Sequence, residues 1–369
     1  MSSPADHGLL SPVWAGTAVE SLTDDDAVVR ALLRVEAALL TAQSAPEGAA
    51  QAVAALRFDS RSLALAAVAG GNPVIPLVAA VREAVPDEVA AWVHRGATSQ
   101  DVLDSALMLV VDDVRREVLV DLGSVAAHLA SLADRTRAVP ALARTLTQPA
   151  LPTTLGFRVA GWLAGVQDAA AALLACDLPA SLGGPVGHGF APDVVAAFAG
   201  ELGLAAPVVG WHVRRTPVVG MAHALTVAGG AVGKIAADLL VMAQGEVGEA
   251  REGAPGGSSS MPHKANPTQS VLVVSAARQL PALASVLGAS LVAEQERATG
   301  GWHAEWEPLR SMLRLAGGAA ARGATYLPSV EYDEDALARN LAGLDVTADL
   351  THVDAWIDRV LARQEEVFP

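Results

Sequence analysis

The residues with the clearest capacity for chemistry lie in one short run, Gly-Ser-Ser-Ser-Met-Pro-His-Lys-Ala-Asn-Pro at positions 257–267. Glycine lets the backbone approach a ligand closely, the hydroxyls of Ser258 and Ser259 can accept or donate protons, and Lys264 supplies a positive charge. A flexible linker would share the glycines and serines, but it would rarely end in Met-Pro-His-Lys-Xaa-Asn-Pro. The run therefore predicts proton transfer on an anionic substrate.

Charge and cysteine content limit the partners of such a loop. The chain has 40 acidic and 25 basic residues, a formal net charge of -15, and no run of Lys or Arg, so nucleic acid is not an expected partner. Cys176 is the single cysteine, which excludes an internal disulfide and a metal site built from several cysteines. Residues 1–7 lack the basic region and apolar run of a secretory signal, so a reducing cytoplasm is the expected setting.

The elements that must position the loop are predicted to be helices. Apolar residues recur at spacings of three and four over long windows, which indicates an all-α chain. Shorter helices are expected in the N-terminal third, at 24–43, 60–68, 72–84 and 87–93. Longer ones are expected at 99–137, 153–175, 217–252 and 268–297, and two short ones in the tail at 333–342 and 351–363. The long helices predict an elongated bundle, with the serine-rich loop between the last two.

The long helices are unusually apolar. Segments 271–274 and 283–292 leave little room for a solvated face, so packing against other copies of the chain is expected. The stretches 218–242 and 271–293 are long enough to cross a membrane. Each contains residues that disfavour a span, namely His223, Lys234 and Asp238 in the first and Arg278 and Pro281 in the second. Because intramembrane charges are costly, buried bundle helices are favoured and no membrane partner is expected.

The run Gly-Gly-Ala-Val-Gly-Lys-Ile at 229–235 is similar to a phosphate-binding loop. Its spacing is one residue short, and Ile235 stands where Ser or Thr is required. A glycine face for close helix packing is the favoured interpretation.

Three blocks, in order along the chain, carry a family resemblance. The run 257–267 resembles the signature loop of the fumarase/aspartase superfamily, and 94–101 and 144–152 resemble its first and second blocks. The segment 296–306 is similar to the branch of 3-carboxy-cis,cis-muconate cycloisomerases, and 211–215 resembles a substrate-side block of the cycloisomerase and adenylosuccinate lyase branch. The resemblance implies a three-domain all-α fold, here 1–97, a central bundle 98–327 carrying the signature loop 253–267, and a reduced C-terminal domain 328–369. It also implies a cofactor-free homotetramer, without a metal, whose active sites are built from three subunits.

The resemblance also assigns roles to residues. Members of the family remove a proton alpha to a carboxylate, pass through an aci-carboxylate and expel a group from the beta carbon. The catalytic serine falls on Ser258. The implied substrate-binding residues are His94, Thr98, Ser99, Gln148, Arg215, Ser259, Lys264, Asn266 and Arg297. For two of them a structural role remains open, because His94 can be a structural histidine and Arg297 can serve in an ion pair.

Two positions depart from the family pattern. Most members place a histidine in the second block and orient it with a glutamate just past the signature Asn-Pro, whereas this chain has Leu146 and Val271. An amine or hydroxide needs protonation to leave, but a carboxylate leaves or attacks as a stable anion. His188 could replace the missing acid, although a structural role is favoured.

The loss of the histidine narrows the expected reaction. We expect lactonisation of the tricarboxylate 3-carboxy-cis,cis-muconate, with Ser258 delivering the proton. Two alternatives remain, a lyase with another stable leaving anion, such as a nitrosuccinate lyase, and a catalytically silent homologue.

Overall fold

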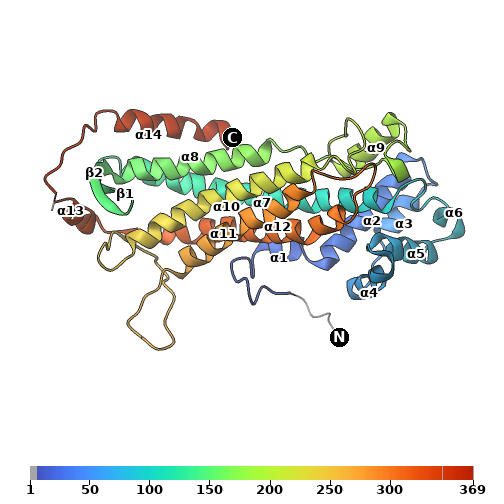
Figure 1. Cartoon of the computed structure of the whole chain (residues 1–369), viewed down its shortest axis with the longest axis horizontal. Coiled ribbons are helices and arrows are strands. Elements are labelled where there is room, and N and C mark those ends of the chain that lie inside the picture. The colour runs from blue at the N-terminus through green and yellow to red at the C-terminus, as the bar shows by residue number, and fades with distance from the viewer. Residues whose placement is uncertain (1–5, 343, 369) are drawn as a thin grey trace.

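A computed structural model describes residues 6–342 and 344–368. Five long helices lie side by side in an elongated bundle (Figure 1): α7 (Ser99–Arg135), α8 (Leu155–Leu174), α10 (Thr216–Met242), α11 (Thr268–Ala289) and α12 (Gly301–Tyr326). Their facing sides carry the buried Leu, Val and Ala residues that form one continuous core. The prediction of an all-α fold with an elongated central bundle is confirmed.

Helix α7 sets the length of the molecule. Its 37 residues span about 55 Å at 1.5 Å per residue. The helix begins at Ser99 because Asp101 accepts a hydrogen bond from the backbone N–H of Thr98, closing a capping box. Residues near the start of α7 and residues beyond its end therefore lie at opposite ends of the bundle.

Short helices gather around the start of α7. They are α2 (Asp25–Ala42), α3 (Ala49–Ala54), α4 (Ser60–Gly70), α5 (Val74–Ala84) and α6 (Asp87–Ala90), and α9 (Pro192–Leu202) packs against α2 (Figure 1). Helix α1 (Ala18–Leu22) packs farther along the bundle, against α7 and α12, with Val19 beside Gly317. Two single-turn 3-10 helices, Gly184–Val186 and Leu327–Ser329, lie in connections. The shorter N-terminal helices were expected. Helices α1, α3 and α9 were not expected; α1 and α3 are only five and six residues long, too short to show a helical period.

The C-terminal segment runs back along the bundle. Helix α13 (Glu334–Ala342) packs against the strand β1, whereas α14 (Val353–Ala362) and α15 (Gln364–Val367) lie on α8 (Figure 1). Both short tail helices were predicted. The boundaries of the three domains stay a prediction.

A β-hairpin at the far end of α7 was not predicted. Strands β1 (Pro140–Thr145) and β2 (Gln148–Thr154) pair antiparallel, and β3 (Ala250–Arg251) pairs with β4 (Glu331–Tyr332). Proline within a run argues against a strand, and β2 contains two. The hairpin tolerates these prolines because β1 and β2 form a sheet of two strands, so no further strand needs a hydrogen bond from a proline nitrogen.

Two helix ends were predicted too far along the chain. Helix α10 ends at Met242 rather than at 252, because Gly245 and Gly248 follow and Gly248 has a φ of +63°. Helix α11 ends at Ala289 rather than at 297, and the chain then turns through Gln295 with a φ of +46°. Apolar residues continue at spacings of three and four past both ends, so this pattern does not mark the residues at which the two helices stop.

The glycines of α10 allow α11 to approach closely. A Cβ built on Gly229 would lie 2.1 Å from Leu280 Cδ1, and one on Gly233 would lie 2.5 Å from Ala277 Cβ. The run 229–235 is thus a packing face within a helix and not a phosphate loop.

We expect Gly233→Leu to lower the thermal unfolding temperature, because overpacking costs about 1–3 kcal/mol, more than the gain in helix propensity. Gly161→Ala of α8 is the control, since its Cβ would meet open space and alanine favours the helix. Calorimetry compares the two, and equal unfolding temperatures would contradict the close packing.

Candidate active site

The first block of the sequence forms the turn that leads into α7. His94 has a φ of +59°, and Glu36 of α2 holds it there. The Glu36 carboxylate, which is fully buried, accepts from the His94 backbone N–H at 3.0 Å and contacts ring Nδ1 at 2.7 Å. Thr98 and Ser99 follow, both partly exposed. The free edge of the His94 ring is its Nε2 side.

Asp101 ties this turn to two other segments. Its buried carboxylate accepts from the backbone N–H groups of Thr98, Gly183 and Gly184 at 2.7–3.0 Å and contacts His212 Nε2 at 2.7 Å. An ionised Asp101 only accepts, so Nε2 carries the proton. His212 Nδ1 is buried without a hydrogen-bond partner among the described residues.

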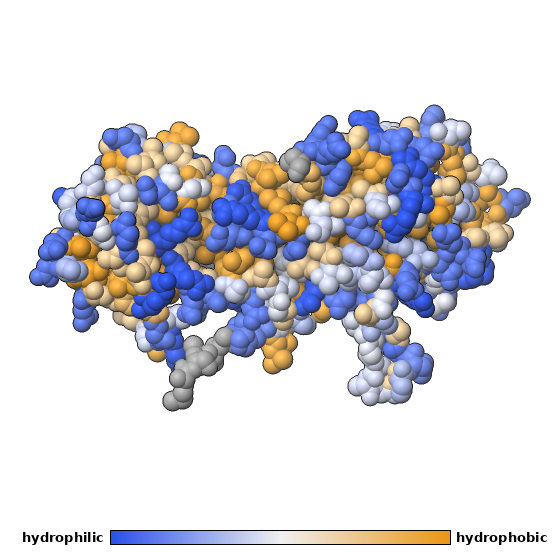
Figure 2. Space-filling view, turned by 180° about the vertical axis from the view of Figure 1, so that it is seen from behind, coloured by the Kyte–Doolittle hydropathy of each residue, from blue (hydrophilic) through white to orange (hydrophobic). Residues whose placement is uncertain are grey.

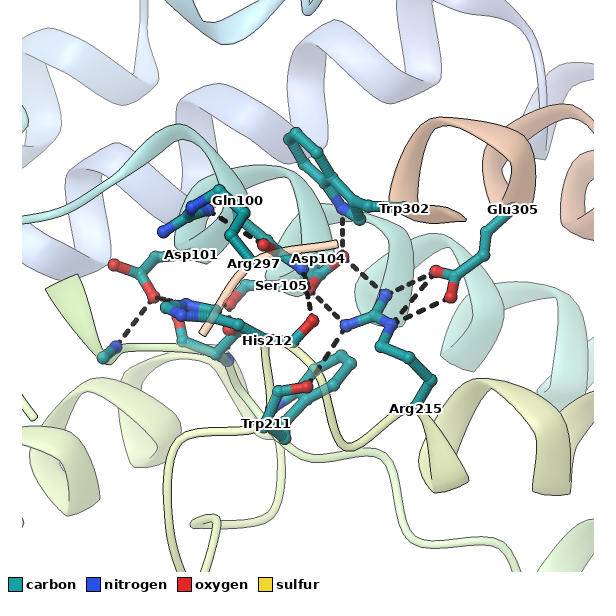
Figure 3. Close-up of polar contacts among 12 residues, drawn as sticks. Gln100, Asp101, Asp104, Ser105, Trp211, His212, Arg215, Arg297, Trp302 and Glu305 are labelled. Atoms are coloured by element: carbon teal, nitrogen blue, oxygen red, sulfur yellow. Dashed lines mark hydrogen bonds and ion pairs between the residues drawn. The ribbon is translucent and has the colours of Figure 1, made fainter. Parts of the chain in front are cut away.

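Arg215 lies in a buried ion-pair network (Figure 3). Its guanidinium donates to Asp104 of α7 at 2.7 and 3.0 Å and to Glu305 of α12 at 2.5–3.2 Å. Trp302 Nε1 also donates to Asp104, at 2.9 Å. Burial lowers the pKa of Arg215, but the two carboxylates outweigh it and raise this pKa above its ordinary value.

The Arg215 guanidinium is thus held by two protein carboxylates. Breaking either buried pair would leave a carboxylate uncompensated at considerable cost. That Arg215 also holds a substrate carboxylate stays a prediction. Its geometry is that of a residue that fixes α7, α10 and α12 to one another.

Arg297 closes the same end of the bundle. It donates to Gln100 Oε1 and to the Pro185 carbonyl, both at 2.9 Å, while Gln100 Nε2 donates to Asp104 at 3.2 Å and to the His212 carbonyl at 2.9 Å (Figure 3). Among the residues that the structure describes, Arg297 is thus tied to neutral groups and not to an ion pair. His188 lies exposed in the neighbouring loop.

The signature loop stands out from the opposite end of the bundle, between α10 and α11 (Figures 1 and 2). Its base is closed by two backbone hydrogen bonds of 2.8 Å between Gly256 and Asn266. Ser258 Oγ accepts from the Met261 backbone N–H at 3.1 Å, and Asn266 Nδ2 donates to the Gly257 carbonyl. Ser259 and Lys264 are exposed. The loop thus presents its polar groups outward, away from its own chain.

Glu252 anchors the loop to the helix that follows it. Its buried carboxylate accepts from the backbone N–H of Gln269 at 3.1 Å and from both the N–H and Oγ of Ser270, at 2.8 and 2.7 Å. A carboxylate at this position satisfies otherwise free N–H groups of α11 and interacts favourably with its dipole.

The hairpin carries the second block at this same end. Gln148 is exposed at the start of β2. Leu146 is 95% exposed at the hairpin tip, and Val271, on the first turn of α11, is 50% exposed. Both apolar replacements of the family dyad thus face outward from the chain, as do the predicted binding residues beside them.

The predicted site residues therefore form two separate groups. His94, Thr98, Ser99, Arg215 and Arg297 lie at the start of α7, whereas Gln148, Ser258, Ser259, Lys264 and Asn266 lie at the other end (Figure 1). The length of α7, about 55 Å, separates them. Within one chain the first sequence block lies at the opposite end of the bundle from the second and third blocks. The predicted binding residues of one chain therefore do not form a complete site. The roles of these residues stay predictions.

Sequence reasoning missed the buried residues that hold these groups in place. They are Glu36, Asp104, His212, Glu249 and Glu305, with exposed fractions of 3% or less. The signal that the sequence offered was an acidic residue on an otherwise apolar face of a helix. Such a side chain is rarely fully buried unless it is paired.

Within the described residues, no group of three or more His, Cys, Asp or Glu side chains is arranged to hold a metal ion.

Comparison with known proteins decides the family. A family model described as "Lyase" matches residues 26–281. The nitrosuccinate lyase of Streptomyces davaonensis is 43% identical over 98% of this chain and 81% of its own length. The chain belongs to the fumarase/aspartase superfamily. Within this superfamily it is an enzyme of the lyase and cycloisomerase type.

Other superfamily members agree with this assignment. The 3-carboxy-cis,cis-muconate cycloisomerase of Pseudomonas putida is 34% identical over 96% of this chain and 88% of its own length. The crystal structure of the 3-carboxy-cis,cis-muconate lactonizing enzyme from the same organism superimposes with a TM-score of 0.89 at 27% identity, covering 98% of this chain and all of that one. The resemblance that the sequence blocks indicated is confirmed.

Proposed function

We propose that this enzyme eliminates nitrite from nitrosuccinate to give fumarate. The observation that carries the proposal is the 43% identity over 98% of the chain to a nitrosuccinate lyase, compared with 34% to the cycloisomerase of Pseudomonas putida. The apolar Leu146 and Val271 support it, because nitrite is a stable anion that leaves without a proton donor.

The proposed reaction balances without a cofactor. Ser258, ionised to its alkoxide, takes a proton from the carbon alpha to one carboxylate, and Lys264 and the backbone N–H groups of the loop stabilise the negative charge that develops on that carboxylate. The electron pair of the broken C–H bond forms the double bond, and the C–N bond breaks with its pair on nitrite. The proton then passes from Ser258 to solvent.

The proposal requires several copies of the chain in one assembly. The two groups of predicted residues lie at opposite ends of α7, and α11 is long and apolar with only 28% of its most apolar window buried. Helix α10 also has the length and composition of a membrane span, and half of its window is buried. We propose that other subunits of a homotetramer cover these helices and bring Ser258 of one chain to Ser99 of another.

A second candidate is lactonisation of 3-carboxy-cis,cis-muconate, the reaction expected from the sequence. The observation that favours it is the match to the lactonizing enzyme, with a TM-score of 0.89 over 98% of this chain. In this reaction a substrate carboxylate attacks the alkene and Ser258 gives a proton to the carbon alpha to another carboxylate. It too needs no histidine at position 146.

The test is a parallel assay of the purified protein with nitrosuccinate and 3-carboxy-cis,cis-muconate, with adenylosuccinate as an amine-releasing control. We expect nitrite and fumarate in equal amounts from nitrosuccinate, above the rate without enzyme. Loss of muconate absorbance without nitrite release would overturn the first candidate in favour of the second. Turnover of neither by a folded assembly would leave a catalytically silent homologue.

A further inference from the structure

A buried carboxylate joins the hairpin to the approach of the signature loop. Glu249 lies between α10 and β3 and has an exposed fraction of 0%. Its Oε1 and Oε2 accept from Arg144 Nη2 at 2.6 Å and Arg144 Nη1 at 2.9 Å. A bidentate pair of this kind fixes both the distance and the orientation of the two groups. Because Arg144 belongs to β1, the hairpin cannot shift without breaking it.

Two further elements bind the same carboxylate. Asn340 of α13 donates through Nδ2 to Glu249 Oε1 at 2.9 Å and to the Val247 carbonyl at 2.8 Å. Arg158 of α8 places Nη1 3.7 Å from Glu249 Oε2 and donates through Nη2 to the Leu142 carbonyl of β1 at 2.7 Å. One carboxylate therefore fixes β1, α8, α13 and the segment leading to the loop.

The hairpin tip needs such support. Leu146 and Thr147 have φ values of +49° and +66°, the sign that a tight two-residue turn requires and that Asn-Gly normally supplies. Side chains with a Cβ pay about 1–3 kcal/mol each for a sparsely populated conformation of this kind, and it persists only where the surrounding structure determines it. Arg144 lies directly beneath this tip in β1, and Gln148 follows it in β2.

We propose that Glu249, Arg144 and Asn340 form a clamp of positioning residues that holds the strained hairpin tip, and with it Gln148, in its substrate-binding position. The reduced C-terminal segment thereby contributes to substrate binding through α13, without touching the substrate. The proposal deepens the proposed function, on which it rests for the role of Gln148.

The consequence for catalysis follows from the geometry. A misplacement of about 1 Å in a binding group costs on the order of a hundredfold in rate. Loss of the clamp frees the tip to relax from its strained turn, which moves Gln148, while Ser258 lies in a loop whose base is closed by its own Gly256–Asn266 hydrogen bonds. Binding should therefore suffer more than the chemical step.

The test compares Arg144→Lys with Arg363→Lys in the assembled enzyme. Lysine keeps the charge of Arg144 but cannot make the bidentate contact. We expect about a 10–100-fold lower kcat/KM, mostly through a raised KM, and faster hydrogen exchange confined to 140–154 and 247–252. Arg363 also pairs with a carboxylate, but through a single exposed contact of its Nη1 with Asp168 Oδ1 at 2.6 Å, away from the hairpin, so its variant should match the wild type.

Asn340→Ala is the milder second variant and guards against misfolding of the first. It should raise KM severalfold, and its effect should not add to that of Arg144→Lys, because both act through Glu249. The proposal would be overturned if kcat fell while KM stayed unchanged, or if the effects of the two substitutions on kcat/KM were additive. Hydrogen exchange needs no substrate: unchanged exchange over 140–154 in both variants refutes the clamp even if the proposed reaction is wrong.

Discussion

Ser258→Ala is expected to lower kcat by about 10²–10⁴-fold, the usual contribution of a positioned proton-transfer group. The reason is that this chain has no second acid or base at the family's dyad positions, where Leu146 and Val271 stand. Ser258 must then carry the proton alone. The measurement is the initial rate of nitrite release from saturating nitrosuccinate, or of muconate consumption if that substrate is the one turned over.

The matched control for this variant is Ser260→Ala. Ser260 is an exposed serine of the same loop. Its contact with Ser258 Oγ, at 3.4 Å, is made by its backbone N–H and does not depend on its side chain. Its variant should retain most of the activity and the same oligomeric state. If Ser258→Ala stayed within a few-fold of the wild-type rate, the proton would have to move through another group, and the exposed His188 would be the first to examine.

The sequence blocks and the helices were predictable because each rests on a local pattern. The run 257–267 has an unusual combination of residues, and α7 begins at Ser99 as its capping pattern indicates. The hairpin at 140–154 was not predictable, since its prolines suppress the strand pattern and its turn lacks glycine. Helix α12 was also missed as an element.

The supports of the site were not predictable for a different reason. Asp104 and Glu305 meet at Arg215 from positions 201 residues apart, and Glu249 meets Arg144 across 105. No periodicity or spacing within one element encodes such a pairing. The family pattern supplies residues that match known binding positions, whereas the residues that hold them in place emerge only from tertiary contacts.

A mixture of two inactive variants is expected to recover activity if sites are shared between chains. Ser99→Asp places a carboxylate where a substrate carboxylate is expected, at a helix start that favours acidic residues, so the fold should persist. Ser258→Ala removes the proton carrier at the other end of α7. In a site that takes these two residues from different subunits, random assembly from equal amounts leaves about a quarter of the sites with both groups intact.

The control for this mixture is Ser258→Ala combined with Lys264→Ala. Both residues lie in the same signature loop, so every loop in the mixed assembly lacks one of them and no recovery is expected. The two mixtures are refolded together or co-expressed and then assayed at equal protein concentration. Recovery in the first mixture alone means that the ends of α7 from different chains meet in one site. Absence of recovery in mixed assemblies of confirmed composition would contradict shared sites, because one chain keeps Ser99 and Ser258 at opposite ends of the bundle that α7, about 55 Å long, spans.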